Sequence, residues 1–446
     1  MAPLTRRRKN ALAAAPPAPV IDPADRISKL PEEIQAQVLS FLPAQEAVRT
    51  CVLARTWRHV WKFTRRLLIT GDSVQEVREF VDLLLINFAS LDASEIRFDP
   101  CEEFDDDDDI DPYLDDEDTS SLNRWISRVL ECQIQMLWVD IDARGYFDAY
   151  LHMSNRLLVS RHLTRLELTG VLFICRCLNL DGCPALEHLE INECCLEDVR
   201  KITSLSLKHL VITSCESNDA RNRIQICVPR LVSLLWLGNI DVMTPLLERM
   251  PELVEAKFQI NSYRDKCYCD DPMACYHITQ DGDTSDIDSD SDDGEEGSGD
   301  YAGQNTTKCV VLEGLAQARD LVLLADRPTF IFKRDLRWCP TFSMLKTLVL
   351  TQVYWCEPAD CSVLECMLEH APLLEKLTLT LKKEPRDGKY KVEIKGYPDA
   401  KVKSTKISQH LQIVKIICED VNGIFFNVLN FLGTLNLCFE TRVTKK

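Results

Sequence analysis

The residues with the clearest capacity for chemistry are four potential metal ligands that lie close together in the sequence. Cys267, Cys269, Cys275 and His277 have the spacing C-x-C-x5-C-x-H, and thiolate and imidazole groups are the usual ligands of zinc. The cluster borders an acidic stretch, however, and the C-x-x-C pairs of zinc ribbons and RING domains do not occur in the sequence. A zinc site here stays open as an alternative, and our prediction is a protein without a metal or other cofactor.

Other chemistry is not indicated by any motif. The sequence has no GxxxxGK[ST], GxGxxG, HExxH or GxSxG pattern, so we expect no catalytic residues. Its 20 cysteines are scattered along 446 residues, which favours free thiols in a reducing compartment over a disulfide framework. The start of the chain is basic and then rich in Ala and Pro, which predicts a disordered tail over residues 1–24 rather than a signal peptide. We therefore expect a protein of the nucleus, the cytoplasm or both.

The net charge of −18 is unevenly distributed. Twelve acidic and no basic residues lie between Glu102 and Asp118, and ten acidic and no basic residues lie between Asp281 and Asp300. These stretches predict acidic disordered loops at about 101–119 and 265–305. The remainder is nearly neutral and has no clustered basic face, which argues against nucleic acid as a partner. No apolar run reaches the length of a membrane span, so we also expect no membrane partner.

Near the N-terminus, the segment from Asp25 to Phe63 has the pattern of short apolar-faced helices. Pro31 suits the start of one helix and Pro43 ends it. Apolar residues recur at helical spacing along three stretches: Ile34, Val38, Phe41 and Leu42; then Ala47, Val48, Cys51 and Val52; then Trp57, Val60 and Trp61. A unit of about 40 residues buries too little surface to be stable alone, so these side chains need a covering surface from the chain or from a partner.

The central part of the chain repeats the template LxxLxLxx(N/C)xL, which places a strand at LxL and a buried Asn or Cys after it. Taking the fourth template position as the marker, the steps from Leu166 to Ala256 are 23, 21, 24 and 22 residues. Such repeats must stack, so they predict a curved parallel sheet with Cys194 and Cys215 as buried ladder residues. The copies are Leu163–Leu166–Leu168, Leu186–Leu189–Ile191–Cys194–Leu196, Leu207–Leu210–Ile212–Cys215, Leu231–Leu234–Trp236–Asn239, Leu253–Ala256–Phe258–Asn261, Leu345–Leu348–Leu350 and Leu374–Leu377–Leu379, with Leu137 and Val139 as an earlier strand.

The C-terminal segment predicts a strand from Leu411 to Ile417, a turn at Asn422-Gly423 and an amphipathic helix through Phe425, Leu429 and Leu432. A solenoid needs an atypical end to cover its last apolar layer. We therefore expect this segment to act as a cap.

Residues 25–63 closely resemble the F-box of plant F-box proteins with leucine-rich repeats, because Leu30-Pro31, Leu42-Pro43 and both tryptophans fall in register with that family. The C-terminal segment resembles, more loosely, the FBD region of the same proteins. The resemblance implies a mixed α/β fold: an F-box of three helices over 25–70, a leucine-rich-repeat solenoid over 71–390, and an FBD-like α/β cap over 391–446.

The resemblance also implies partners and a function. An F-box binds a Skp-type adaptor and through it cullin and RING subunits, so the chain would be the non-catalytic substrate receptor of an SCF-type ubiquitin ligase. A recognition or scaffold protein acting outside ubiquitin transfer is the alternative. The expected adaptor-binding residues are Leu30, Pro31, Ile34, Leu39, Leu42, Pro43, Val48, Val52, Trp57 and Trp61.

An unidentified target protein is expected on the concave sheet. Alternation along a strand turns the template leucines inward, so the residues between them face the cavity. Those residues are Arg165, Glu167, His188, Glu190, Asn192, His209, Val211, Thr213, Glu255, Lys257, Lys376 and Thr378.

Overall fold

The computed structural model describes residues 27, 29–53, 55–100, 114–143, 149–217, 223–238, 244–260, 309–325, 335–351, 362–380, 390–397, 410–418, 423–434 and 438–445. The predicted tail at 1–24, residues 101–113, the acidic loop at 265–305, the cluster of Cys267, Cys269, Cys275 and His277, and the template residues Asn239 and Asn261 lie outside these ranges. The chain divides into two compact units, Met1–Arg65 and Arg66–Lys446.

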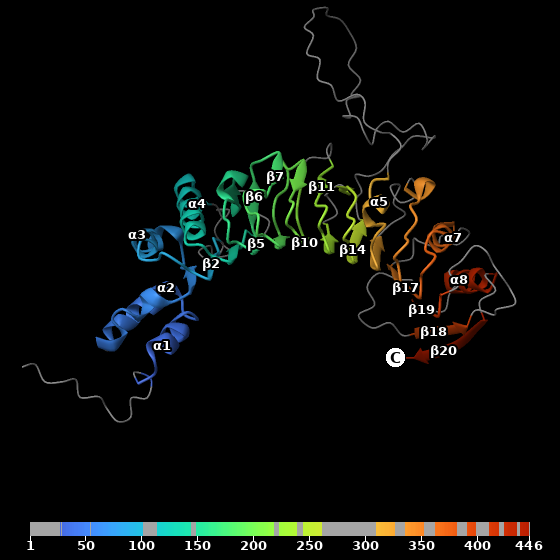
Figure 1. Cartoon of the computed structure of the whole chain (residues 1–446), viewed down its shortest axis with the longest axis horizontal. Coiled ribbons are helices and arrows are strands. Elements are labelled where there is room, and N and C mark those ends of the chain that lie inside the picture. The colour runs from blue at the N-terminus through green and yellow to red at the C-terminus, as the bar shows by residue number, and fades with distance from the viewer. Residues whose placement is uncertain are drawn as a thin grey trace, which may run out of the picture. The chain divides into compact units, whose positions relative to one another are not determined.

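The first unit contains two short α-helices, α1 (Glu32–Leu39) and α2 (Ala44–Arg49), coloured blue in Figure 1. Pro31 and Pro43 each occupy the position just before a helix, where the fixed φ of proline suits the turn into helical backbone. The expected third helix is absent from the described residues of this unit. Three 3₁₀ turns follow α2. The last two replace the expected helix, and the backbone between them leaves helical geometry at His59, with φ −125°. These turns are η1 (Thr50–Val52), η2 (Arg55–Trp57) and η3 (Val60–Phe63).

The second unit is built on a 14-stranded sheet. All neighbouring strands from β1 to β19 pair in parallel, and β18 then pairs antiparallel with both β19 and β20. The spatial order is β1 (Arg66–Thr70), β2 (Ala93–Phe98), β3 (Met136–Ile141), β5 (Arg165–Thr169), β8 (His188–Asn192), β10 (His209–Thr213), β12 (Ser233–Leu237), β14 (Glu255–Ile260), β15 (Asp320–Ala325), β16 (Thr347–Thr351), β17 (Lys376–Thr380), β19 (Ile413–Cys418), β18 (Tyr390–Tyr397) and β20 (Cys438–Lys445).

The strand register confirms the repeat template. The marker residues Leu166, Leu189, Leu210, Leu234 and Ala256 are direct cross-strand partners, and each is buried. The same row continues through Leu321, Leu348 and Leu377 to Val414. Strands β1, β2 and β15 were not among the predicted copies. The sheet therefore begins at Arg66, inside the span expected for the F-box, and bridges the segment where the sequence repeat stops.

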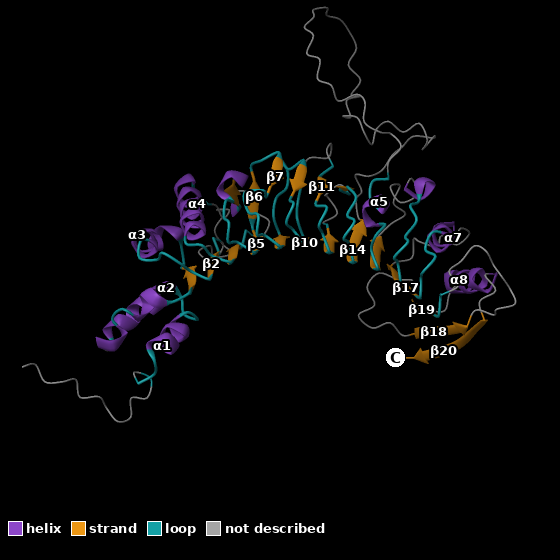
Figure 2. Cartoon of the chain, viewed as in Figure 1, coloured by secondary structure: helices purple, strands orange, loops and turns teal. Residues whose placement is uncertain are grey.

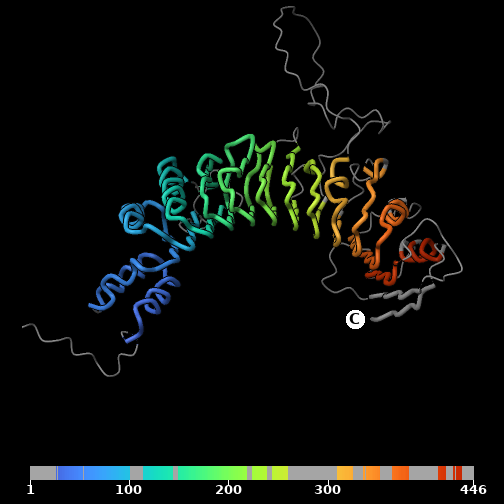
Figure 3. The backbone as a smooth tube through the Cα atoms, in the orientation of Figure 1, coloured from blue at the N-terminus to red at the C-terminus, as the bar shows by residue number. Residues whose placement is uncertain are grey.

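A second layer packs behind the main sheet. It includes the short parallel strands β7 (Cys177–Asn179), β9 (Lys201–Thr203), β11 (Gln225–Cys227) and β13 (Leu246–Leu247), the pair β4 (Leu151–Met153) and β6 (Val171–Phe173), and the turns η5 (Asn155–Leu157) and η8 (Leu336–Trp338). Its helices are α3 (Val74–Leu85), α4 (Asp116–Glu131), α5 (Leu312–Leu315), α7 (Ser362–Glu369) and α8 (Gly423–Thr434). Figure 2 shows these elements on one side of the main strands, and the tube in Figure 3 follows the coils that join the two layers. No described helix is both long enough and apolar enough to cross a membrane.

We expected an acidic loop at about 101–119. The end of that range is helical instead. Residues 116–119 form the first turn of α4, and the Asp115 side chain caps it by accepting a hydrogen bond from the Asp118 backbone N–H at 2.6 Å. Acidic groups are favourable at this end of a helix because they complement its dipole. Arg78 on α3 also pairs with Asp118 at 2.7 Å and with Glu117.

Cys194 and Cys215 have the structural role that the template predicts. Both are fully buried, and their Sγ atoms lie 3.4 Å from the Leu168 carbonyl oxygen and 3.6 Å from the Ile191 carbonyl oxygen of the preceding strands. Burial raises the pKa of the Cys215 thiol to about 12 and raises that of Cys194 well above its usual value. Both thiols therefore stay neutral and donate hydrogen bonds to buried backbone carbonyl groups between successive repeats.

The C-terminal elements agree with the sequence pattern. β19 begins at Ile413 and α8 begins at Gly423, and the side chains of Phe425, Val428 and Leu432 on α8 are buried. The antiparallel strands β18 and β20, which the pattern did not predict, complete the end of the sheet.

Candidate protein-binding surfaces

The first unit has a small apolar core of its own. Ala36 and Leu39 of α1 pack with Ala47 of α2, Trp57 of η2 and Val60 of η3, and Leu42 and Trp61 pack partly buried against them. Gln35, also buried, donates a hydrogen bond from its side-chain amide to the Leu30 carbonyl oxygen at 2.9 Å. This contact holds the entry segment on α1.

Outside that core, the unit leaves much apolar surface uncovered. Of the eighteen large apolar side chains that are exposed in the described residues, eight belong to this short unit. A stripe at helical spacing runs along α1 and its flanks, and Val52 at 83% exposure is the most exposed of the eight. We call these eight residues the apolar patch: Ile27, Leu30, Ile34, Val38, Phe41, Val52, Leu53 and Phe63.

The predicted adaptor-binding residues fall into three groups. Leu30, Pro31, Ile34 and Val52 are exposed, and Leu42, Pro43, Val48 and Trp61 are half-buried. Leu39 and Trp57 are instead buried in the core of the unit, at 1% and 6% exposure. Those two residues therefore support the surface rather than form it.

Five residues of the apolar patch were not among the predicted adaptor-binding residues. For two of them, Val38 and Phe41, the helical spacing from Ile34 indicates a shared face. Of the other three, Ile27 and Leu53 lie outside the helices and Phe63 ends the 3₁₀ turn η3, so α-helical spacing carries no such signal for them.

The second candidate surface is the open face of the main sheet, which carries the residues between the template leucines. The strands show the expected alternation, and none of the predicted target-binding residues is buried. These residues lie at the less buried positions of the alternation, and their role in binding a target stays a prediction. Arg165, Glu167, His188, Glu190, Asn192, Val211, Thr213 and Thr378 are half-buried, whereas His209, Glu255, Lys257 and Lys376 are exposed.

The N-terminal half of the open face is charged. Arg165, His188 and His209 are cross-strand partners, and so are Glu167 and Glu190. Arg165 pairs with Glu167, and the rings of His188 and His209 lie 5.8 Å apart. Burial, with a smaller effect of Glu167, raises the pKa of Glu190. Burial, with a smaller effect of Arg165, lowers the pKa of His188.

Beyond β10 the open face also carries apolar side chains, which lie among charged ones such as Glu255, Lys257 and Lys376. Leu235 and Leu237 on β12, Val322 and Leu324 on β15, and Val349 on β16 are all half-buried at positions between inward-facing leucines. The prediction did not include them, although strict alternation along the predicted strands of Leu234 and Leu348 places Leu235 and Val349 on this face. One face thus offers both charged and apolar side chains to a partner.

Comparisons with known proteins agree with this architecture. Residues 27–67 match the F-box domain family. An F-box/FBD/LRR-repeat protein of Arabidopsis thaliana is 30% identical over 219 residues, which is 44% of this chain and 48% of that protein. The Arabidopsis F-box/LRR-repeat protein 13 is 26% identical over 265 residues, covering 54% of this chain and 57% of that protein.

The chain spans about half the length of the curated relatives it matches. Its F-box match covers the described part of the first unit, and the repeats seen in the sequence lie in the sheet of the second. The chain therefore carries an F-box domain joined to a leucine-rich-repeat sheet and is similar to the F-box/LRR-repeat proteins of Arabidopsis thaliana, as its sequence resemblance predicts.

Proposed function

We propose that this protein is the substrate-recognition subunit of an SCF-type ubiquitin ligase, with the F-box binding a Skp-type adaptor and the open face binding a target protein. F-box domains generally bind adaptors of this kind, and through the adaptor the chain would join cullin and RING subunits. The protein itself supplies no catalytic group in this proposal. It brings the target close to activated ubiquitin, and proximity alone contributes greatly to rate.

The observation that carries the proposal is the apolar patch on a unit that matches the F-box family. Isolated exposed apolar residues need no explanation, but the concentration of eight of them on one small helical unit is typical of a protein interface. The patch residues are held by a separate core, so the surface can be changed without removing the side chains that keep the unit folded.

The first test is Val52→Asp in the full chain. A carboxylate placed in an apolar interface must be desolvated, so we expect the dissociation constant for a purified Skp-type adaptor to rise at least about tenfold. Isothermal titration calorimetry measures the constant, and circular dichroism checks that the fold is retained. The matched control is Leu205→Asp, which changes an equally apolar residue, 68% exposed, in the other unit.

Unchanged adaptor binding by the folded Val52→Asp protein, and by Leu30→Ala with Pro31→Ala, would refute the assignment. Trp57→Ala does not serve this purpose because Trp57 lies in the core, where truncation lowers the free energy of unfolding itself. A location in the nucleus or cytoplasm belongs to the same proposal, and fluorescence microscopy of the tagged protein tests it.

A further inference from the structure

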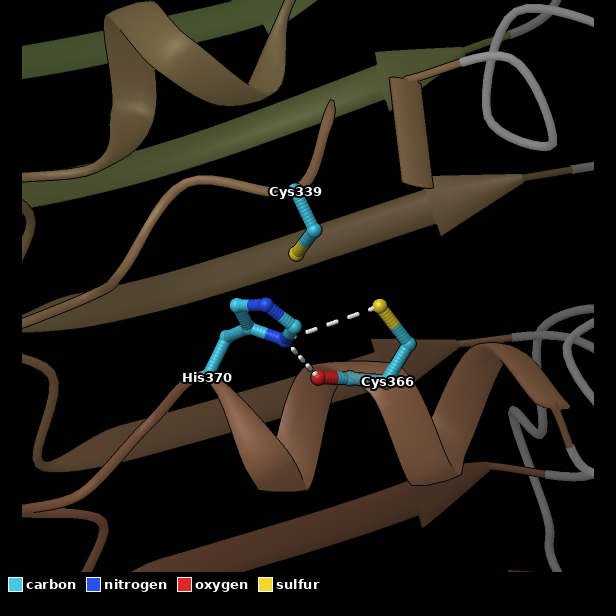
Figure 4. Close-up of side chains that lie close together, drawn as sticks. All are labelled: Cys339, Cys366 and His370. Carbon is cyan, nitrogen blue, oxygen red and sulfur yellow. Dashed lines mark hydrogen bonds between the residues drawn. The ribbon is translucent and has the colours of Figure 1, made fainter. Parts of the chain in front are cut away.

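A cluster of thiol and imidazole groups lies in the second unit and shares no residue with the two surfaces described above. Cys366 lies on α7, and His370 follows just after this helix at a spacing of four residues, which places both side chains on one face. Cys339 comes from the loop that follows η8. Figure 4 shows the two sulfur atoms and the imidazole ring grouped between this loop and the helix.

The geometry of the cluster suits a metal ion. One potential ligand atom of each residue lies within 4.8 Å of the other two, and all three residues are half-buried, so an ion can enter. Cys366 Sγ is 3.7 Å from His370 Nδ1. This contact places the imidazole ring beside the thiol. In a tetrahedral zinc site with bonds of about 2.0–2.3 Å the ligand atoms lie closer together than the 4.8 Å limit met here, so the side chains would rotate slightly to enclose an ion.

The histidine is also held in the tautomer that a metal site requires. His370 Nδ1 lies 2.8 Å from the Cys366 carbonyl oxygen, and a carbonyl can only accept, so Nδ1 carries the proton. The lone pair is then on Nε2. Metal-binding histidines commonly make such a bond from their other ring nitrogen, because it orients the ring and makes the ligand nitrogen more basic.

Backbone contacts fix the loop against the helix. The Phe342 N–H donates to the His370 carbonyl oxygen at 2.8 Å, and Cys366 Sγ lies 3.7 Å from the Leu336 carbonyl oxygen. On the loop side, the buried Cys309 Sγ lies 3.0 Å from the Trp338 carbonyl oxygen. The ligands are therefore positioned by the fold, which lowers the ordering cost of binding a metal.

We propose that Cys339 Sγ, Cys366 Sγ and His370 Nε2 bind one Zn²⁺ ion, with water at the fourth position. Two thiolates and one imidazole form a soft donor set that favours zinc over calcium or magnesium. The ion would join the loop after η8 to α7, and so tie two successive repeats together. This site is distinct from the Cys267, Cys269, Cys275 and His277 segment, which lies outside the described residues.

Binding at this site releases two protons, because zinc binds thiolates. Bound zinc should be lost as the pH falls, since protons compete for the sulfur atoms.

The test is the zinc content of the full chain, purified under reducing conditions and measured by inductively coupled plasma mass spectrometry. We expect about one zinc per chain. The expected result for Cys339→Ser with Cys366→Ser, and separately for His370→Gln, is loss of that zinc with an unchanged circular dichroism spectrum. Cys177→Ser, at an exposed cysteine of β7, is the matched control and should retain the metal.

Two further measurements keep the result decisive if a variant folds poorly. Cobalt added to metal-free wild-type protein should produce the charge-transfer absorption of a thiolate–cobalt bond. Cys267→Ser with Cys269→Ser should leave the zinc content unchanged. The proposal is wrong if the zinc persists in the variants of Cys339 and Cys366, if it disappears with Cys267 and Cys269, or if wild-type protein binds neither zinc nor cobalt.

Discussion

Burial controls the charge of individual side chains on the open face, and His188 is the clearest case. Its imidazole stands beside Arg165 and His209, with Glu167 and Glu190 nearby, and desolvation followed by Arg165 lowers its pKa below the usual 6.5. The unfolded chain therefore takes up the proton first as the pH falls. Because ionisation of His188 is easier in the unfolded state, the folded state loses stability below about pH 6.5.

This reasoning predicts the pH dependence of a His188→Gln variant. Between pH 7.5 and 5.5 the wild-type unfolding midpoint should fall further than that of the variant, since only the wild type carries the unfavourable protonation. Glu190 has the opposite slope, because its raised pKa removes stability as the pH rises through 4.5. Glu190 is present in both proteins but lies 3.8 Å from His188 Nε2, so the difference between the profiles includes their interaction. Thermal denaturation across this range measures the difference, with His162→Gln at an exposed site as the control.

A wild type and variant with parallel pH profiles would contradict this account of His188.

At the scale of elements, one buried carboxylate holds a helix to the repeat that follows it. Asp335 is fully buried, and its two oxygens accept hydrogen bonds from the backbone N–H groups of Val310, Val311 and Leu312 at 2.8, 2.7 and 3.1 Å. Those N–H groups lie at the start of α5. The first N–H groups of a helix have no carbonyl acceptor within that helix. An acceptor from about 25 residues further along the chain replaces a local cap.

We predict that Asp335→Ala lowers the free energy of unfolding by at least about 3 kcal/mol, because it leaves three buried amide groups without their acceptor. Chemical denaturation followed by circular dichroism measures the change. Asp320→Ala, at an exposed position that begins β15, is the control and should change it by less than about 0.5 kcal/mol.

An equally small effect at Asp335 would show that another group or water satisfies these donors.

At the scale of the whole molecule, two surfaces in two separate units have different tasks in the proposed function. The apolar patch belongs to the unit that ends at Arg65, whereas the open face belongs to the sheet that begins at Arg66. Because the surfaces share no residue, changes in one are expected to leave the affinity of the other intact.

We therefore predict that Glu167→Lys with Glu190→Lys reduces target capture at least about tenfold while adaptor affinity is unchanged. These two carboxylates lie side by side on the open face, so reversing both changes its local potential. The measurement is quantitative mass spectrometry of proteins that co-purify with the tagged chain while the proteasome is inhibited. Asp181→Lys with Asp198→Lys, at exposed positions outside the main strands, is the matched control.

An unchanged set of captured proteins would exclude this part of the face, and loss of adaptor binding as well would indicate unfolding.

The sequence by itself determined the features that local spacing specifies. The prolines before α1 and α2, the marker leucines from Leu166 onward and the ladder cysteines all appear where the pattern predicts them. Each of these depends on residues within one helix turn or one repeat. Stacking identical units then extends the local rule along the whole sheet.

Only the tertiary structure decided which side chains are covered. Trp57 and Val52 are both apolar residues of one short segment, yet the first is in the core and the second is 83% exposed, because burial depends on what packs above each. Cys339, Cys366 and His370 come together, and Asp335 reaches the start of α5, through contacts between successive repeats. Long-range contacts leave no fixed spacing in the sequence, so the fold alone brings these groups together.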